Sequence, residues 1–277
     1  MNIKIVSDSS SNLLQLDGVA YATVPLKVIT ARAEYVDDNT LQQEVMLEDL
    51  RTTKEKTQTS CPNAFEWQEA FGDADWVFAV TITSNLSGSF SAAEKARKDA
   101  LAANPNRKIA VIDSLSAGPE MVLLIERIKE GVLAGNSFEE IEADVRAYAA
   151  HTHLIFSLQS LKNLARNGRV SPIVAKVAGL LGIRVVGIAS AEGTLQPLYK
   201  PRGRGKTLDA IYDEMKRLGY AGGKVRIAQC NNPEKANDLR EIVLKEFPTA
   251  DVTIVPTTAL CTYYAEEGGL MIGLESV

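Results

Sequence analysis

The sequence contains few of the residues from which metal and redox centres are built. Histidine occurs twice, as His151 and His153, and cysteine three times, as Cys61, Cys230 and Cys261. The cysteine spacing matches neither a disulfide framework nor a zinc site, and no Glu or Cys stands at ligand spacing from the histidines. We therefore expect free thiols, structural or surface histidines, and neither a metal nor a cofactor.

Long apolar stretches are also missing. The longest run without a charged residue, residues 76–93, contains seven hydroxyl or amide side chains, too many for a transmembrane helix. Asp8 and Asp17 interrupt the first apolar stretches, which is unlike a secretory leader. These absences predict a cytoplasmic protein with no stable membrane insertion.

Basic residues are outnumbered by acidic ones, 30 to 35, which argues against a nucleic-acid-binding protein. The charge is uneven, because residues 1–150 have a net charge of −9 and residues 151–277 one of +4. Between residues 162 and 206, nine basic residues accompany one acid, Glu192, and one aromatic residue, Tyr199. This stretch would suit an acidic partner, and a solvated basic face is the alternative. A nucleic-acid-binding surface is a poorer interpretation, because only one aromatic residue lies among the basic ones.

Motifs of the common enzyme classes are absent. There is no glycine-rich phosphate loop, no Gly-x-Gly-x-x-Gly after a strand, no His-Glu-x-x-His and no Gly-x-Ser-x-Gly. The serines within residues 7–11 have no nearby histidine and no Ser-x-x-Lys partner. A helix cap or a turn therefore explains them better than a nucleophile does.

In the first 150 residues, apolar strands alternate with polar turns and helical patterns. Such alternation predicts a mainly parallel sheet flanked by helices, with binding sites at the carboxyl ends of the strands. The expected strands are residues 3–6, 19–29, 76–82 and 108–112, and the expected helices lie near 44–54, after Pro62, and over 89–103, 120–134 and 138–150.

The rest of the chain predicts a second α/β unit with a mixed sheet. Glu192-Gly193 between two apolar runs is typical of a hairpin and therefore of antiparallel pairing. With a boundary near His151, the predicted domains are residues 1–150 and residues 151–277. The expected strands of the second domain are residues 153–156, 184–189, 194–202, 224–229, 252–255 and 270–274. Its expected helices are a short one that ends near residue 164 and two longer ones near residues 208–218 and 234–247.

Two segments place hydroxyl groups at the expected start of a helix, residues 59–62 (TSCP) and residues 84–89 (SNLSGS). A helix N-terminus offers unpaired N–H groups and about half a positive charge, so hydroxyl donors there complete a site for an anion. If both helices start at one edge of the sheet, Thr59 and Ser87 can hold one carboxylate. Neither segment contains Lys or Arg, which suits an anion at the inner end of an apolar cavity. Ordinary helix capping is the alternative.

Six motifs occur in order between residues 5 and 202, and with them the chain resembles the DegV family. Members of that family include the fatty-acid-binding subunits of bacterial fatty acid kinase. The resemblance covers essentially the whole chain. The motifs are residues 5–10 (IVSDSS), 59–62 (TSCP), 86–93 (LSGSFSAA), 111–114 (VIDS), 161–171 (LKNLARNGRVS) and 200–202 (KPR).

The resemblance implies a two-domain α/β protein of the DegV-type fold that encloses one long-chain fatty acid between or beneath its domains. The carboxylate would be held by Thr59 and Ser87, with Ser60 and Gly88 beside them. In the kinase system, a separate ATP-dependent catalytic subunit phosphorylates that carboxylate, and the arginines that match Arg169 and Arg202 are associated with docking and transfer. The chain would then be a non-catalytic carrier whose only ligand is the lipid.

One region departs from the family pattern. Well-studied binders carry a histidine near the C-terminus that joins the carboxylate network, whereas residues 261–269 here read CTYYAEEGG. Tyr263 is the expected occupant of the histidine position. A tyrosine hydroxyl can donate a hydrogen bond but does not become a cation near neutral pH. Tyr263 and Tyr264 can equally be packing residues.

An acyl chain of about 16 carbons offers on the order of 12 kcal/mol from methylene burial before association costs. A tunnel that binds so tightly needs a wall that opens, and Gly179 and Gly182 are candidates for it, although close helix packing explains them equally. The candidate lining residues are Phe90, Leu115, Met121, Leu158, Leu161, Leu164, Val177, Leu180, Leu181 and Ile183.

A small-molecule enzyme, such as a phosphotransferase, is the alternative from a different functional class. Asp8 with Ser9, and Asp113 with Ser114, stand at expected strand ends, where a general base could act. Each Asp is followed by Ser in a turn, a composition that favours a cap of the turn backbone. Turnover without any added kinase would distinguish the enzyme from the carrier.

Overall fold

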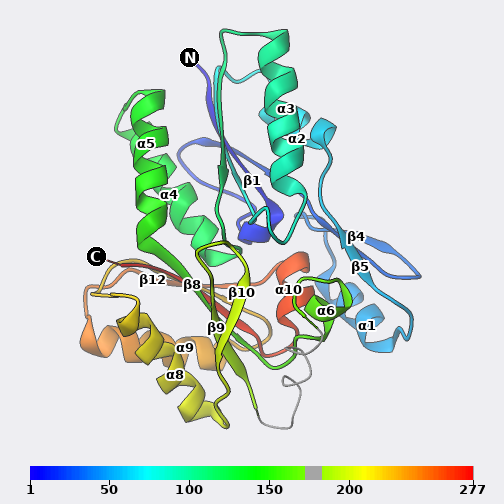
Figure 1. The fold of residues 1–277 in the computed structure, drawn as a ribbon, viewed down its shortest axis with the longest axis vertical. Coiled ribbons are helices and arrows are strands. Elements are labelled where there is room, and N and C mark those ends of the chain that lie inside the picture. The colour runs from blue at the N-terminus through cyan, green and yellow to red at the C-terminus, as the bar shows by residue number, and fades with distance from the viewer. Residues whose placement is uncertain (172–182, 277) are drawn as a thin grey trace.

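The computed structural model describes residues 1–171 and 183–276. Their strands form three sheets (Figure 1), here called sheets A, B and C. Sheet A has the order β2-β1-β6-β7, and all of its pairs are parallel, as the sequence predicts. Its strands are β1 (Ile3–Asp8), β2 (Ala20–Val24), β6 (Trp76–Thr81) and β7 (Lys108–Asp113).

Helices cover both faces of sheet A (Figure 1), because its strands are apolar on both sides. In β6, Val77 and Ala79 face one layer of helices, while Phe78 and Val80 face the other. The α3 helix has the predicted bounds. The first layer contains α2 (Ala64–Phe71) and α3 (Ser89–Ala103), and the second contains α4 (Pro119–Leu133) and α5 (Phe138–Tyr148).

The single strand predicted over residues 19–29 is wrong, because the segment divides between two sheets. Its first part is β2, and after Pro25 it continues as β3 (Lys27–Ile29) in the antiparallel sheet B. Proline has no N–H to donate to a ladder, which makes it a natural break between strands. Sheet B has the order β4-β3-β5, in which β4 is Glu34–Val36 and β5 is Gln58–Ser60. The helix α1 (Gln43–Thr52) lies between β4 and β5 in the chain.

Sheet C is mixed, and the predicted hairpin around Glu192-Gly193 is confirmed as the antiparallel pair β9–β10. The order β10-β9-β8-β13-β11-β12 places β13 in the interior of the sheet, between β8 and β11. The strands are β8 (Thr152–Leu158), β9 (Val185–Ala189), β10 (Leu195–Tyr199), β11 (Val225–Gln229), β12 (Val252–Pro256) and β13 (Leu270–Glu275).

Helices α8 (Arg204–Arg217) and α9 (Pro233–Glu246) pack on one face of sheet C, and α4 packs on the other. Because α4 also contacts β1 and β6, it lies between sheets A and C. Gly273 of β13 permits this contact, since a Cβ there would lie 2.5 Å from the backbone carbon of Pro119. The change from sheet A to sheet C falls at the turn η2 (Ala149–His151), and a division into domains at residue 150 stays a prediction.

Candidate functional site

A cavity of about 290 Å³, here called the sheet-junction cavity, lies where the three sheets meet. Its wall includes Ile82 after β6 of sheet A, Thr59 of β5 in sheet B, and Phe156 of β8 in sheet C. The short helix α10 (Ala259–Ala265) completes it. The large apolar residues of the wall are Leu26, Ile82, Leu86, Leu154, Phe156, Leu158, Leu164, Leu195, Leu260 and Met271.

The alternation of β8 produces one side of this wall. Leu154, Phe156 and Leu158 are two residues apart, so they share one face of the strand, and all three line the cavity. Ile155 lies on the other face and packs in the core under α8. The antiparallel register pairs Phe156 with Met271 of β13, which brings a second apolar side chain to the same surface.

The two hydroxyl segments meet at the cavity. Thr59, Ser60, Ser87 and Gly88 all line it. The segments are in contact, because a Cβ on Gly88 would lie 3.0 Å from Cys61 Sγ. A Cβ at position 88 would require the Cys61 thiol to shift by a few tenths of an ångström.

Thr59 reaches the cavity from a strand and not from a helix start. The side chain of Asn63 caps α2, accepting hydrogen bonds from the N–H groups of Phe65 (2.8 Å) and Glu66 (3.1 Å). The helix predicted to begin near Pro62 begins at Ala64, and Thr59 lies before it on the edge strand β5, so it does not belong to the helix N-terminus. Ser87 does precede a helix, and its Oγ accepts a hydrogen bond from Ser89 N at 3.3 Å.

The tyrosine in the wall is Tyr264 and not Tyr263. Its hydroxyl lies 2.7 Å from Thr59 Oγ1, whereas the Tyr263 hydroxyl bonds Thr57 (2.7 Å) and Asn167 (2.9 Å) outside the cavity. Successive residues of a helix point about 100° apart, so the two tyrosine side chains leave α10 in different directions. Burial raises the pKa of Tyr264, which keeps its phenol neutral and able to donate a hydrogen bond.

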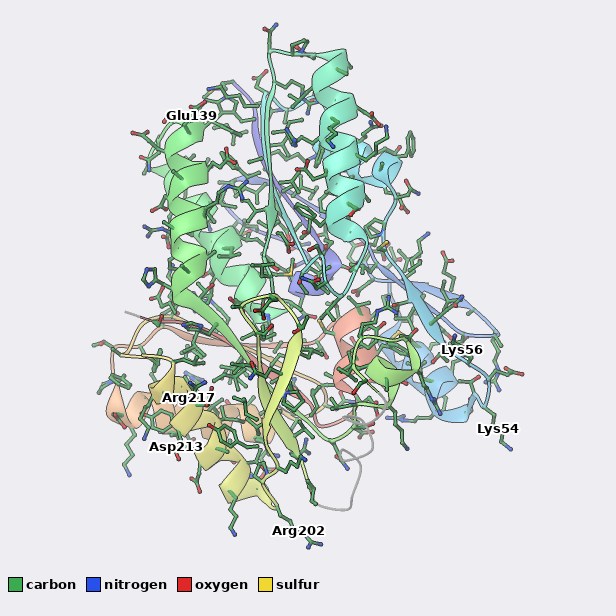
Figure 2. The ribbon with its side chains drawn as sticks, in the orientation of Figure 1. Lys54, Lys56, Glu139, Arg202, Asp213 and Arg217 are labelled. Carbon is green, nitrogen blue, oxygen red and sulfur yellow. The ribbon has the colours of Figure 1, made fainter. Side chains whose placement is uncertain are left out.

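The two arginines predicted to face a partner or a phosphate lie in different places. Arg169 lines the sheet-junction cavity, and its Nε donates to the carbonyl oxygen of Leu86 at 3.2 Å. A cation therefore accompanies the hydroxyl groups, although the two hydroxyl segments themselves contain none. Arg202 does not line this cavity. Figure 2 shows it at the lower edge of the molecule, pointing away from it.

The carboxylates considered for catalysis hold the backbone in place. Asp8 is fully buried and accepts hydrogen bonds from Ser89 Oγ at 2.7 Å and from Ile82 N at 2.9 Å. Burial raises its pKa. Asp113 accepts from the N–H groups of Ser84 and Leu115, each at 3.1 Å. Neither carboxylate lines the cavity.

Their serine neighbours also bond the backbone. Ser9 Oγ accepts a hydrogen bond from Leu26 N at 2.9 Å, and Ser114 Oγ donates to the carbonyl oxygen of Ser116 at 3.1 Å. Neither serine lines the sheet-junction cavity. The four residues of the enzyme alternative therefore shape turns near the cavity and present no base or nucleophile to it.

The sequence identified only part of the lining. Leu158 and Leu164 are in the wall, whereas Leu115 is exposed and Ile183 borders a different cavity. Strand alternation in β8 would have added Leu154 and Phe156 to the prediction. The remaining candidates pack outside the wall, namely Phe90, Met121 and Leu161, or lie outside the described residues, namely Val177, Gly179, Leu180, Leu181 and Gly182.

Two kinds of feature are absent from residues 1–171 and 183–276. No group of three or more His, Cys, Asp or Glu side chains is arranged to hold a metal ion. No helix in these ranges has both the length and the apolar character needed to cross a membrane.

Comparisons with known proteins agree on one family. The DegV family model, described as an uncharacterised protein, matches residues 2–276. A DegV domain-containing protein of Streptococcus pneumoniae is 43% identical over 279 residues, covering 99% of each chain.

Two solved structures are similar over their whole length. A DegV family protein from Eubacterium eligens, loaded with heptadecanoic acid, has a TM-score of 0.97 at 40% identity, covering 99% of this chain and 100% of that one. The B3 protein of the Streptococcus pneumoniae fatty acid kinase (Fak), loaded with linoleic acid, has a TM-score of 0.98 at 42% identity, covering 100% of both.

Proposed function

Because the chain belongs to the DegV family, we propose that it binds a long-chain fatty acid in the sheet-junction cavity. One observation carries the proposal: a single cavity joins a wall of large apolar side chains to the hydroxyls of Thr59, Ser87 and Tyr264. The two similar structures loaded with heptadecanoic and linoleic acid support the ligand class.

The wall supplies what each part of such a ligand needs. Each buried methylene of the acyl chain contributes about 0.8 kcal/mol, while a carboxylate is costly to bury unless hydrogen-bond donors satisfy it. The hydroxyls of Thr59, Ser60, Ser87 and Tyr264, here called the hydroxyl cluster, are such donors. Gly88 allows the two segments to meet, and Arg169 supplies a positive charge nearby.

We also propose that the chain is a carrier that presents the carboxylate to a separate ATP-dependent kinase subunit. The similarity to the B3 protein of a fatty acid kinase supports this role. The turn-bonding roles of Asp8 and Asp113 support a chain that does not perform the phosphorylation itself. Arg202 is exposed on the surface, where a partner can contact it.

Organic extraction of freshly purified protein, followed by mass spectrometry, tests the ligand. We expect a long-chain fatty acid in the wild type and none in the Thr59→Ala/Ser87→Ala double variant. The matched control is Thr253→Ala/Ser84→Ala, which removes two exposed hydroxyls, one on an edge strand and one in the turn before Ser87. Equal lipid in all three proteins would contradict the hydroxyl cluster as the carboxylate site.

Addition of a fatty acid kinase catalytic subunit and ATP tests the carrier role. We expect acyl phosphate only when both proteins are present. Arg202→Ala should keep its lipid but give slower phosphorylation with a weaker dependence on salt, because one charge of the docking surface is lost. Acyl phosphate formed by this chain and ATP alone would contradict the role.

A further inference from the structure

A second cavity, of about 360 Å³, lies between the first turns of α8 and α9. It shares no lining residue with the sheet-junction cavity, and its volume falls in the range of about 300–1,000 Å³ that is common for small-molecule sites. Three of its lining residues are cationic, Arg184, Arg204 and Lys235. We call it the helix-start cavity.

Both helices direct a positive end at this cavity. Gly203, the N-cap of α8, has no side chain to accept from the first N–H groups. Asn232, the N-cap of α9, makes no capping bond, because its side-chain amide donates to the carbonyl oxygen of Gly268 at 2.8 Å. Each helix has 14 residues, long enough for a developed dipole, and its first N–H groups have no capping side chain.

Lys235 is the observation that points to a ligand. Its side chain lines the cavity and is only 6% exposed, yet no hydrogen bond or ion pair joins it to any residue in the described ranges 1–171 and 183–276. Residues 172–182 contain no Asp or Glu, so they cannot supply a carboxylate. Burial, together with the charges of Arg184 and Arg204, lowers the pKa of Lys235 to about 8. The stem of Lys235 is buried and its ammonium has no partner among the described residues, so an anion in the cavity would offset the cost of holding the charge there.

The acidic side chains near this cavity form ion pairs with Arg204 and not with Lys235. Arg204 pairs with Glu234 and Asp238 on α9, so these two acids are already engaged. Arg184 Nη1 donates to the carbonyl oxygen of Gly268 at 2.7 Å and has no carboxylate partner among the described residues. Asp238 also attracts the Lys235 ammonium, but neither Lys235 nor Arg184 forms an ion pair with a described residue, and two helix N-termini border the same cavity.

We propose that the helix-start cavity binds the phosphate group of a small soluble phosphate compound, with Lys235 and Arg184 as its charged donors. A phosphate monoester or inorganic phosphate carries up to two negative charges and several acceptor oxygens, which match two cations and two sets of free N–H groups. A phospholipid headgroup shares this chemistry, but the ammonium of a side chain that is 6% exposed is recessed from a flat bilayer surface. This site does not depend on fatty acid binding.

Calorimetric titration with inorganic phosphate, at pH 7 and low salt, tests the site. We expect saturable binding that is about tenfold weaker or more in Lys235→Met, since a hydrogen bond to a charged group contributes about 1.5–3 kcal/mol. The matched control is Lys245→Met, which removes the same charge from an exposed position in the last turn of α9. Equal affinity of the wild type and Lys235→Met, or equal loss in both variants, would overturn the proposal.

Two further measurements address folding and the source of the phosphate. In the unaltered protein, the pKa of Lys235, followed by NMR of its ε-carbon, should rise when phosphate is added, and an unchanged value would overturn the proposal. Vesicles of phosphatidylglycerol should retain the wild type and Lys235→Met equally. Loss of vesicle binding in Lys235→Met with unchanged phosphate affinity would overturn it in favour of a lipid headgroup. Fatty acid recovered from Lys235→Met should equal that of the wild type, which separates this test from that of the carrier.

Discussion

Two adjacent tyrosines in α10 have different tasks. Tyr264 bonds Thr59 inside the sheet-junction cavity, and Tyr263 bonds Thr57 and Asn167 outside it. Thr59, Ser87 and Gly88 could be found from sequence because they stand in recognisable motifs. The choice between the tyrosines could not, because both are aromatic and neighbouring, and the rotation of the helix about its axis depends on packing against distant elements.

Replacing each tyrosine by phenylalanine separates the two tasks. Tyr264→Phe removes one donor of the hydroxyl cluster, so we expect fatty acid affinity to fall about threefold to tenfold, the equivalent of one hydrogen bond. Tyr263→Phe should leave affinity unchanged and lower the free energy of unfolding by about 1–2 kcal/mol, because Thr57 and Asn167 lose a buried partner. Lipid titration and urea unfolding of both variants measure this, and an affinity loss confined to Tyr263→Phe would contradict the assignment.

At the scale of elements, α10 depends on a carboxylate from a segment more than 200 residues away. Asp37 is buried and accepts hydrogen bonds from the N–H groups of Ala259 (2.6 Å) and Leu260 (3.1 Å), and from Thr258 Oγ1 (3.2 Å). It thereby caps the helix that supplies Leu260 and Tyr264 to the cavity. Burial raises its pKa to about 6 despite these bonds.

Asp37→Ala should therefore affect both stability and ligand binding. We expect the free energy of unfolding to fall by about 1–3 kcal/mol, because two buried N–H groups lose their acceptor. Retention of lipid should fall as well, since α10 forms part of the wall. Asp38→Ala is the control, because among the described residues the Asp38 carboxylate bonds only Thr40, within its own turn. Urea unfolding and lipid extraction measure both effects, and equal stability of the two variants would refute the capping role.

Local patterns predicted most elements but not sheet membership. The Ala-rich periodicity of residues 89–103 gave a helix with the observed bounds, because its signal is contained within the segment itself. The split of residues 19–29 between β2 and β3 depends on which distant strands pair with each half. Pro25 was the one local sign of the break.

At the scale of the whole molecule, α4 joins the two larger sheets through a buried acid. Glu120, in its first turn, accepts hydrogen bonds from Ser116 Oγ and, at 2.9 Å, from Thr152 Oγ1 at the start of β8. Burial raises the pKa of Glu120 to about 7. In the unfolded chain, the ordinary pKa of 4.5 applies, so between these values only the folded state holds the proton.

Stability should therefore fall as the pH rises from about 4.5 to 7, by up to roughly 3 kcal/mol from this residue. Glu120→Gln keeps the shape of the protonated acid and removes its titration. We expect the variant to gain stability relative to the wild type across that interval, while Asp37 titrates equally in both. Urea unfolding at several pH values measures the difference. A difference that does not change with pH would show that Glu120 is ionised in the folded protein.

The position of β13 bears on when the protein can first hold its ligand. The strand that contains Met271 is inserted between β8 and β11, so the wall beside Phe156 is unfinished until residues 270–275 have left the ribosome. A nascent chain of about 260 residues would contain the two hydroxyl segments but would lack the part of the cavity wall that Met271 supplies. A chain in which β13 has not yet paired with β8 and β11 therefore cannot complete the wall around a ligand.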